Sequence, residues 1–337
     1  MIISEKLKER FCKDCNIPIK IYKEPYFMDR LKLYDPFYNS LNKWNLFLKE
    51  LKYYSCEQDY FEEYNKIKDL AINYIKSSPN YQNFNEIDMN QYSIKHQGLP
   101  HKDVFHSSND GRTFISIDMK KANFSSLQNY SHKIFGYSKT WEDFMHMFTD
   151  NEHIVNSKYI RQVILGNCNP KRHITYEKYL MDKVLSLIID SQFKVLDLTI
   201  DNVVFFSNDE IVFDITDMSI NSDQITELQD LLNKTMTFPL KAELFVLHKI
   251  QGTDGYYKEI LNEDLDKSIE FKCLDSQILP FVIRQFNKEL ITDSDKIFIH
   301  DGILAQFVEI PEIIIPPLTI LKKEDSSLKL ENDFDLD

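Results

Sequence analysis

Apolar residues recur at helical spacing in the first part of the chain. Between Pro36 and Ser77 they fall three and four residues apart, and Ser78-Pro79-Asn80 follows as a stop signal. This spacing predicts amphipathic helices, the second of them covering about residues 58–75. Residues 80–100 are polar. We therefore expect residues 1–100 to form an N-terminal region that is mostly helical.

Short β-type runs begin after residue 100. Val104 to His106 and Arg112 to Asp118 flank Asn109-Asp110-Gly111, a pattern that predicts a hairpin. Val195 to Phe206 and Phe238 to Ile250 each predict a strand, because both are rich in β-branched and aromatic residues. Helices are expected from about Ala122, at Trp141 to Phe148, at Ser157 to Leu165, at Ile174 to Ser191 and at Ser222 to Met236.

This order of elements is not the regular strand–helix alternation of a doubly wound sheet. It favours an α+β fold, in which helices back an antiparallel sheet. We predict a central domain over residues 101–260 and an α+β extension over 261–320, with a hairpin near its start. Residues 321–337 are predicted to be a disordered acidic tail, since Glu324 to Asp337 holds six acids against one lysine.

The net charge of −13 argues against sequence-wide binding of nucleic acid. Two stretches without any acid, Met119 to Lys139 and Asn156 to His173, still allow a local basic surface. The start of the chain lacks a signal-peptide layout, and no apolar run approaches the ~18 residues of a membrane span. The five cysteines do not have the spacing of a disulfide framework, which favours a reducing compartment. These features together predict a cytoplasmic protein without membrane contact. Cys12 and Cys15 form a lone C-x-x-C, for which ordinary thiols are favoured over a structural zinc site.

Two aspartates stand out because Asp is a poor strand former. Asp118 ends the run that begins at Thr113, and Asp201 lies inside the run Val195 to Phe206. Two carboxylates on adjacent strands would form a hard oxygen site for Mg²⁺ or Mn²⁺, as in two-metal phosphoryl transfer. We therefore expect Asp118 and Asp201 to be the catalytic, metal-binding pair, close enough to share a cation. The alternative is that both face water at strand ends.

Four basic residues lie between these aspartates. Lys158 and Arg161 are three residues apart on an expected helix and share one face, so we predict that they bind the triphosphate of a nucleotide. Lys171 and Arg172 follow the break at Pro170 and are predicted to bind nucleic-acid phosphate. The alternatives are a solvated helix face for the first pair and an ordinary basic loop for the second.

The same segments resemble the palm region of right-hand nucleic-acid polymerases over roughly residues 105–260. Phe114 to Phe124 is similar to motif A, Ser157 to Asn167 to motif B, and Thr199 to Phe205 to motif C. The motifs are closest to those of family A DNA polymerases, whereas the spacing of the aspartates is nearer to that of reverse transcriptases. The chain departs from the family A pattern where His-Asp-Glu is replaced by Ile200-Asp201-Asn202 and where the Tyr-Gly after motif B is replaced by Asn169-Pro170.

The resemblance implies a palm-like sheet, a thumb-like extension and a nucleotidyltransferase that uses Mg²⁺, a nucleoside triphosphate and nucleic acid. A virus or mobile element with an AT-rich genome is the expected source. A second hypothesis is a catalytically inactive palm-like subunit that binds nucleic acid, or a protein partner through its acidic surface or tail. A third is a different metal-dependent phosphotransferase that uses the same two aspartates.

Overall fold

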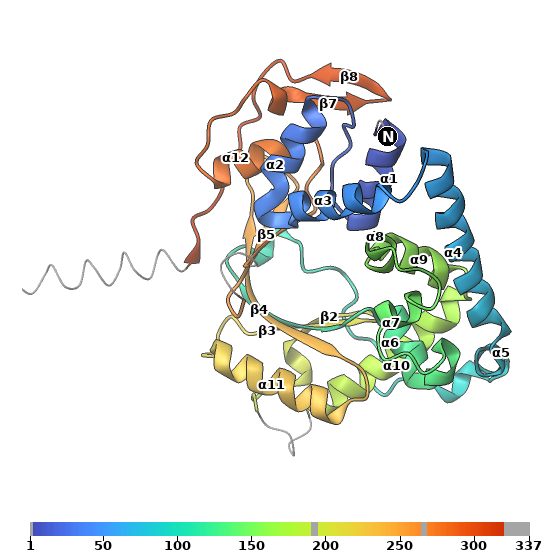
Figure 1. Ribbon diagram of the computed structural model, residues 1–337. Helices are drawn as coiled ribbons and strands as arrows, with labels where there is room; N and C mark the ends of the chain where they lie inside the picture. The colour runs from blue at the N-terminus through green and yellow to red at the C-terminus, as the bar shows by residue number, and fades with distance from the viewer. Residues whose placement is uncertain (1–2, 190–194, 264–267, 320–337) are drawn as a thin grey trace, which may run out of the picture.

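The computed structural model describes residues 3–189, 195–263 and 268–319. Within these ranges, six strands form an antiparallel sheet in the order β2-β3-β1-β4-β5-β6, and β7 pairs with β8 in a separate hairpin (Figure 1). The expected α+β class with an antiparallel sheet backed by helices is confirmed. The strands are β1 (Thr113–Met119), β2 (Val203–Phe206), β3 (Glu210–Asp214), β4 (Leu240–Lys249), β5 (Tyr256–Ile260), β6 (Ile269–Lys272), β7 (Ile297–His300) and β8 (Ile303–Gln306).

Residues 3–86 are mostly helical, as the apolar spacing predicts. Ser4 begins the first helix by accepting a hydrogen bond from Leu7 N, an ordinary N-cap. Further helices and turns separate β1 from β2, and one helix each follows β3 and β6. The N-terminal elements are α1 (Glu5–Cys15), α2 (Tyr26–Tyr38), α3 (Ser40–Leu51), α4 (Glu57–Ser77), α5 (Pro79–Glu86) and the 3₁₀ turns η1 (Met89–Gln91) and η2 (Ser107–Asn109). The later ones are α6 (Ala122–Tyr130), η3 (His132–Phe135), α7 (Trp141–Met145), α8 (Glu152–Val155), α9 (Lys158–Gly166), α10 (Pro170–Ile189), η5 (Ile200–Asn202), α11 (Ser222–Thr235), α12 (Leu279–Phe286) and η7 (Ser294–Lys296).

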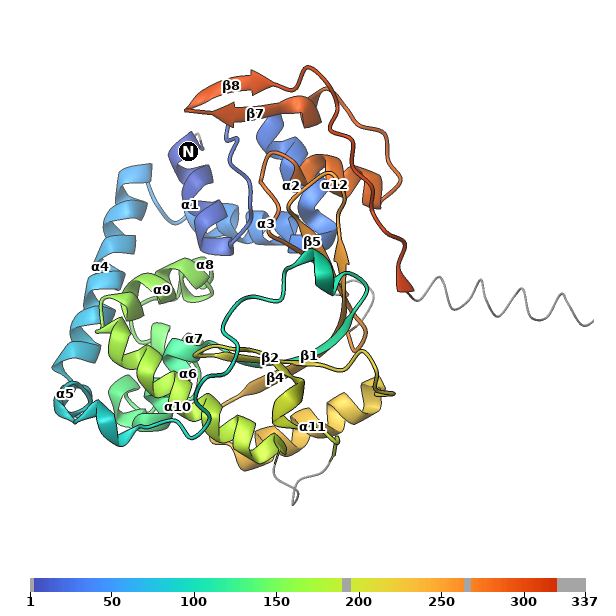
Figure 2. The same ribbon diagram turned by 180° about the vertical axis from the view of Figure 1, so that it is seen from behind.

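The two faces of the sheet differ in chemistry. Ile115 and Ile117 of β1 belong to the main hydrophobic cluster together with Leu228 and Leu232 of α11, so α11 covers this face (Figures 1 and 2). Side chains alternate along a strand. The opposite face, which lies toward α1, α2 and α3, therefore carries Phe114, Ser116 and Asp118 of β1. Phe114 packs there with Phe245 in a second, smaller hydrophobic cluster. We refer to this face as the polar face, because Ser116 and Asp118 occupy its other end.

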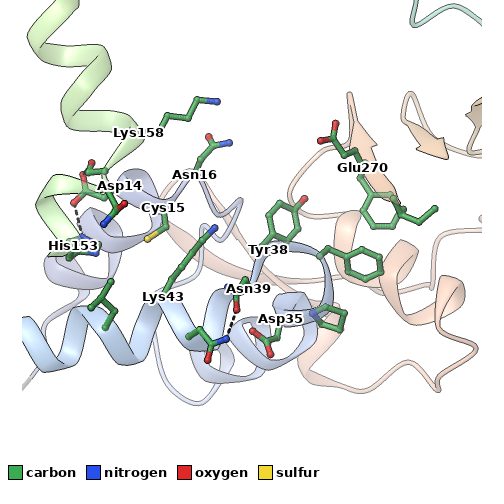
Figure 3. Close-up of a pocket in the computed structure, with 18 of the residues that line it drawn as sticks. Asp14, Cys15, Asn16, Asp35, Tyr38, Asn39, Lys43, His153, Lys158 and Glu270 are labelled. Carbon is green, nitrogen blue, oxygen red and sulfur yellow. Dashed lines mark hydrogen bonds and ion pairs between the residues drawn. The ribbon is translucent and has the colours of Figure 1, made fainter. Parts of the chain in front are cut away.

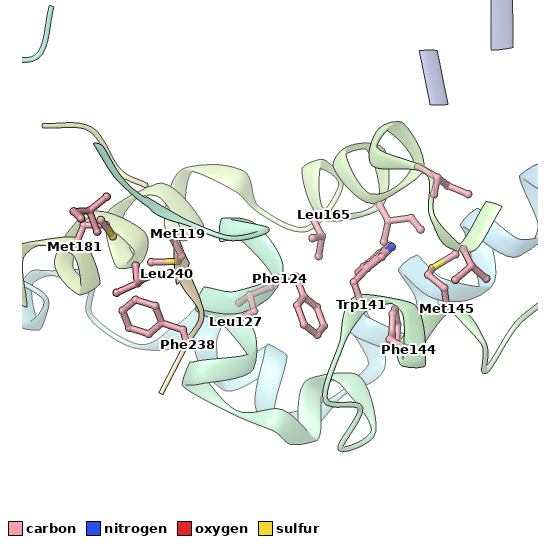
Figure 4. Packing of buried hydrophobic residues seen from close by; sticks show 14 of the residues in the cluster. Met119, Phe124, Leu127, Trp141, Phe144, Met145, Leu165, Met181, Phe238 and Leu240 are labelled. Carbon is pink, nitrogen blue, oxygen red and sulfur yellow. The ribbon is translucent and has the colours of Figure 1, made fainter. Parts of the chain in front are cut away.

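The main hydrophobic cluster continues from the sheet into the helices that follow β1. Phe124 packs against Trp141 and Phe135 at ring-centroid distances of 6.0 and 4.6 Å (Figure 4). The cluster runs from Leu7 to Ile283 and so contains residues from all three of the expected domains. Their boundaries remain a prediction, and the expected tail lies outside the described residues.

Two expected strand assignments differ from the structure. Residues 104–106 form no strand, and η2 replaces the expected hairpin, because β1 pairs with β3 and β4 instead. The run Val195 to Phe206 becomes a strand only at Val203, after the 3₁₀ turn η5. No helix in the described ranges is long and apolar enough to cross a membrane.

Candidate active site

Asp118 lies near the end of β1, on the polar face of the sheet. Its Cα is paired with Glu210 at the start of β3 and with Lys241 near the start of β4. Its side chain is half-buried. β1 ends at Met119, and Lys121 then takes a left-handed conformation (φ 52°) as α6 begins. Asp118 is therefore held by a strand in the middle of the sheet, directly before a sharp change of chain direction.

The turn between β2 and β3 brings two more acids to the same end of the sheet. Asp209 and Glu210 follow Ser207, whose hydroxyl accepts hydrogen bonds from both of their backbone N–H groups at 3.3 and 3.1 Å. Met119 N donates to Asp209 O at 2.8 Å, which fixes the turn against the end of β1. Asp118, Asp209 and Glu210 thus form an acidic cluster built by two neighbouring strands.

The acids of this cluster raise one another's proton affinity. Burial, followed by the charges of Glu210, Asp209 and Glu243, raises the pKa of Asp118 to about 7. Burial also raises the pKa of Glu210, although a hydrogen bond from Ser116 Oγ opposes this effect. A carboxylate that is both desolvated and close to other carboxylates favours a proton or a bound cation.

Lysines compensate a neighbouring acid on the same face. Glu243 lies beside Ser116 in the β1–β4 register and pairs with Lys258 at 2.6 Å and Lys241 at 2.8 Å. Burial acts to raise the pKa of Glu243, but the two ammonium groups outweigh it and lower the pKa to about 2. Glu243 is therefore an ionised, paired carboxylate, whereas Asp118 has no such pair among the described residues.

A buried carboxylate supports the turn from behind. Glu177 of α10 is 1% exposed and accepts a hydrogen bond from Asn208 Nδ2 at 2.8 Å. Burial, together with the charge of Asp209, raises the pKa of Glu177 to about 7, although the Asn208 bond opposes the rise. α10 thereby fixes the position of the residue directly before Asp209.

Asp201 does not join this cluster. It lies in η5, is exposed, and precedes β2, whereas Asp209 follows β2. The register pairs Val203 with Phe213, so Asp201 lies beyond the end of β3 that is opposite to Glu210. Asp118 and Asp201 therefore lie near opposite ends of β3, and each residue of that strand adds about 3.3 Å to their separation. The two carboxylates are too far apart to share a cation, so this expectation is wrong.

Lys158 and Arg161 both lie on α9, as expected, but in different surroundings. Ser157 caps the helix by accepting a hydrogen bond from Ile160 N. Lys158 is exposed, whereas Arg161 is half-buried and burial lowers its pKa, with Glu142 of α7 acting against the shift. Glu142 in turn pairs with Lys121 at 2.5 Å. Arg161 therefore shares an acidic neighbour with Lys121, three residues after Asp118.

Lys171 and Arg172 lie in the first turn of α10. Lys171 is exposed, but Arg172 donates to the carbonyls of Phe84 and Ile87 at the end of α5. Its Nη2–Phe84 O distance is 2.9 Å. These bonds give Arg172 a capping role between two helices, one that its sequence neighbourhood does not reveal.

The sequence does contain a signal for Asp209 and Glu210. The run Val195 to Phe206 is long for a strand, since strands of five or six residues are commonest. Ser207 and Asn208 are turn-forming residues between two apolar runs, so a hairpin with both acids at its turn fits this segment better.

Over the described ranges, no group of three or more His, Cys, Asp or Glu side chains is arranged to hold a metal ion. The cluster offers oxygen donors only, which suits Mg²⁺ or Mn²⁺ once further oxygens come from a nucleotide. Cys12 and Cys15 are free thiols.

Comparisons with known proteins return no relatives. No model of a known family, no curated protein and no solved structure matches this chain.

Proposed function

We propose that this protein is a palm-type nucleotidyltransferase that carries out metal-assisted phosphoryl transfer on nucleic acid. The observation that supports this most is the position of Asp118 beside Asp209 and Glu210, at one end of two neighbouring antiparallel strands. Burial and mutual repulsion make this acidic cluster unfavourable without a cation. A strongly shifted carboxylate surrounded by other acids is typical of functional sites.

Each residue of the site has a distinct role in this proposal. Asp118 and Asp209 would hold Mg²⁺, which would supply charge neutralisation at the reacting phosphate. Ser116 orients Glu210 through its hydrogen bond. Arg161 is the candidate contact for the triphosphate, because a partly desolvated guanidinium binds phosphate oxygens strongly and in a bidentate manner.

The first prediction concerns nucleotide incorporation on a primed template with Mg²⁺ or Mn²⁺. Asp118→Asn and Asp209→Asn should each lower the rate by about 10²–10⁴-fold, since metal-based charge stabilisation contributes several kcal/mol. Asp201→Asn is the matched control and should retain the wild-type rate within about twofold. Thermal unfolding of each variant would show that the Asn substitutions leave the fold intact, because removing one charge relieves repulsion.

Two outcomes would contradict the assignment. If Asp201→Asn abolished incorporation while Asp209→Asn did not, Asp201 and not Asp209 would be the second catalytic carboxylate. If the wild-type protein incorporated no nucleotide on DNA or RNA primers with either metal, the inactive palm-like binding subunit would replace the enzyme as the better hypothesis.

A further inference from the structure

We propose that the cavity between the N-terminal helices and β6 binds a single strand of nucleic acid and leads it to the acidic cluster. The cavity has a volume of about 990 Å³, near the upper end for ligand sites. Its walls come from α1, α2, α3, α8, α9 and β6. Most of these elements lie outside the segment that resembles a polymerase palm. The proposal rests on the proposed function for the identity of the strand.

Unpaired lysines supply the positive charge of this cavity. Lys43 of α3 and Lys158 of α9 line it and extend into it (Figure 3). Among the residues that the structure describes, neither ammonium has a hydrogen-bond or ion-pair partner. Phosphate contacts by such lysines supply most of the sequence-independent affinity for a strand.

The acids that line the cavity are already engaged. Asp14 is 1% exposed and accepts hydrogen bonds from Tyr64 Oη and Ser157 Oγ, both at 2.8 Å. Asp35 accepts from the backbone N–H of Leu41 at 2.8 Å. These hydrogen bonds hold both carboxylates on other partners, so neither forms an ion pair with Lys43 or Lys158.

Aromatic and amide groups give the cavity the means to hold bases. Tyr38 projects into it (Figure 3). Phe271 lines the wall formed by β6. Asn16 and Asn39 both take left-handed conformations, with φ of 53° and 49°, at the ends of α1 and α2. Unpaired bases stack on exposed aromatic rings, whereas the bases of a duplex are already stacked. This chemistry favours a single strand over a duplex.

Lys272 connects the cavity to the acidic cluster. It lies on β6, lines the cavity and pairs with Glu270 at 2.8 Å. Burial acts to lower the pKa of Lys272, but the charge of Glu270, followed by those of Glu243 and Glu210, raises it. Glu270 also lies opposite Lys258 in the β5–β6 register, and Lys258 pairs with Glu243 at 2.6 Å. A row of charged side chains therefore leads from the cavity wall toward the acidic cluster.

The test is fluorescence anisotropy with a labelled 15-nucleotide single strand, in EDTA and without nucleotide. Lys43→Ala and Lys158→Ala should each weaken binding about fivefold at 0.1 M salt and reduce the salt-dependence slope by about 0.7. Tyr38→Ala should weaken binding by about fivefold to 150-fold, since stacking contributes that much per base, and Tyr38→Phe should restore it. Lys66→Ala, on the exposed side of α4, is the matched lysine control and should bind normally.

The proposal is overturned if the lysine and Tyr38→Ala variants bind the strand as tightly as Lys66→Ala does. It is also overturned if a duplex of the same sequence binds as tightly as the single strand. Strand binding without incorporation would reject the proposed function alone, and incorporation without cavity-dependent binding would reject this inference alone.

Discussion

His173 is a buried histidine without a hydrogen-bond partner for either ring nitrogen among the described residues. It lies on α10, is 1% exposed, and packs near the rings of Phe84 and Tyr81 at centroid distances of 5.8 and 6.4 Å. Burial lowers its pKa to about 4. The folded protein therefore keeps this ring neutral at pH values where the unfolded chain, with an ordinary pKa of about 6.5, binds a proton.

This difference predicts a loss of stability in acid. As the pH falls from 6.5 toward 4, protonation of His173 in the unfolded chain favours unfolding, so stability declines over that window. His173→Phe removes this group and the two unpartnered nitrogens. Between pH 7 and pH 5, the variant should lose about 2 kcal/mol less free energy of unfolding than the wild type does. Urea unfolding at both pH values measures this difference.

The exposed His101 provides the control for this prediction. His101→Phe should keep the pH dependence of the wild type. An unchanged pH dependence in His173→Phe would show that the ring is protonated in the folded state.

Single residues also show how far sequence reasoning reaches. Asp118 is recognisable because it ends a strongly apolar run, but the run does not show which acids lie beside it. Asp209 and Glu210 are hidden in a polar turn, where acids are common, and only the pairing of β3 with β1 gives them a role. Arg172 shows the same limit, because its carbonyl partners are on α5, far away in sequence.

At the scale of elements, α9 depends on one serine that has two functions. Ser157 Oγ accepts the N-cap hydrogen bond from Ile160 N at 3.0 Å and donates to Asp14 Oδ1 at 2.8 Å. Asp14 also contacts His153 Nε2 at 3.2 Å. The beginning of α9, and with it Lys158, is therefore fixed to the end of α1.

Ser157→Ala should therefore cost more than the loss of an ordinary cap. Ser4→Ala is the matched control, because Ser4 caps α1 through Leu7 N and should cost about 1 kcal/mol. Ser157→Ala also removes a hydrogen bond to a buried carboxylate, so it should cost about 1.5–3 kcal/mol more. Denaturant titration of both variants gives the two free energies of unfolding. Equal losses would show that the Asp14 bond adds nothing.

The bounds of helices and strands were easier to predict than the segments against which they pair. The apolar spacing and turn residues located α4, α11 and β4 close to their observed bounds. Amphipathic period and flanking stop signals are local properties, so one segment suffices to show them. The proposed hairpin at Asn109-Asp110-Gly111 failed because strand pairing is decided by distant segments, and here β3 and β4 flank β1.

At the scale of the whole molecule, one buried ion pair links the two ends of the described chain. Arg30 of α2 pairs with Asp295 of η7 at 2.9 Å, with the two side chains 4% and 1% exposed. Arg30 also donates to the carbonyls of Ser294 and Ile297, and Arg284 donates to Asp295 at 3.0 Å. α2 and α12 thus form one unit across from the polar face of the sheet (Figure 1).

Arg30→Ala should destabilise the protein by about 3–5 kcal/mol, because it removes one partner of a buried pair and leaves carbonyls unbonded. Lys296→Ala is the control in the same segment. It breaks an exposed pair with Asp293 and should leave the free energy of unfolding unchanged within error. A small effect of Arg30→Ala would show that Arg284 alone is sufficient to hold Asp295.

The Arg30–Asp295 pair also has a consequence for synthesis on the ribosome. Its partners are 265 residues apart in sequence. At translation rates of about 5–20 residues per second, roughly 13–53 s pass between the synthesis of Arg30 and that of Asp295. During that time the Arg30 guanidinium cannot form its ion pair with Asp295, and α2 cannot pack against α12. The nascent N-terminal region is therefore the part of this chain for which a chaperone would matter most.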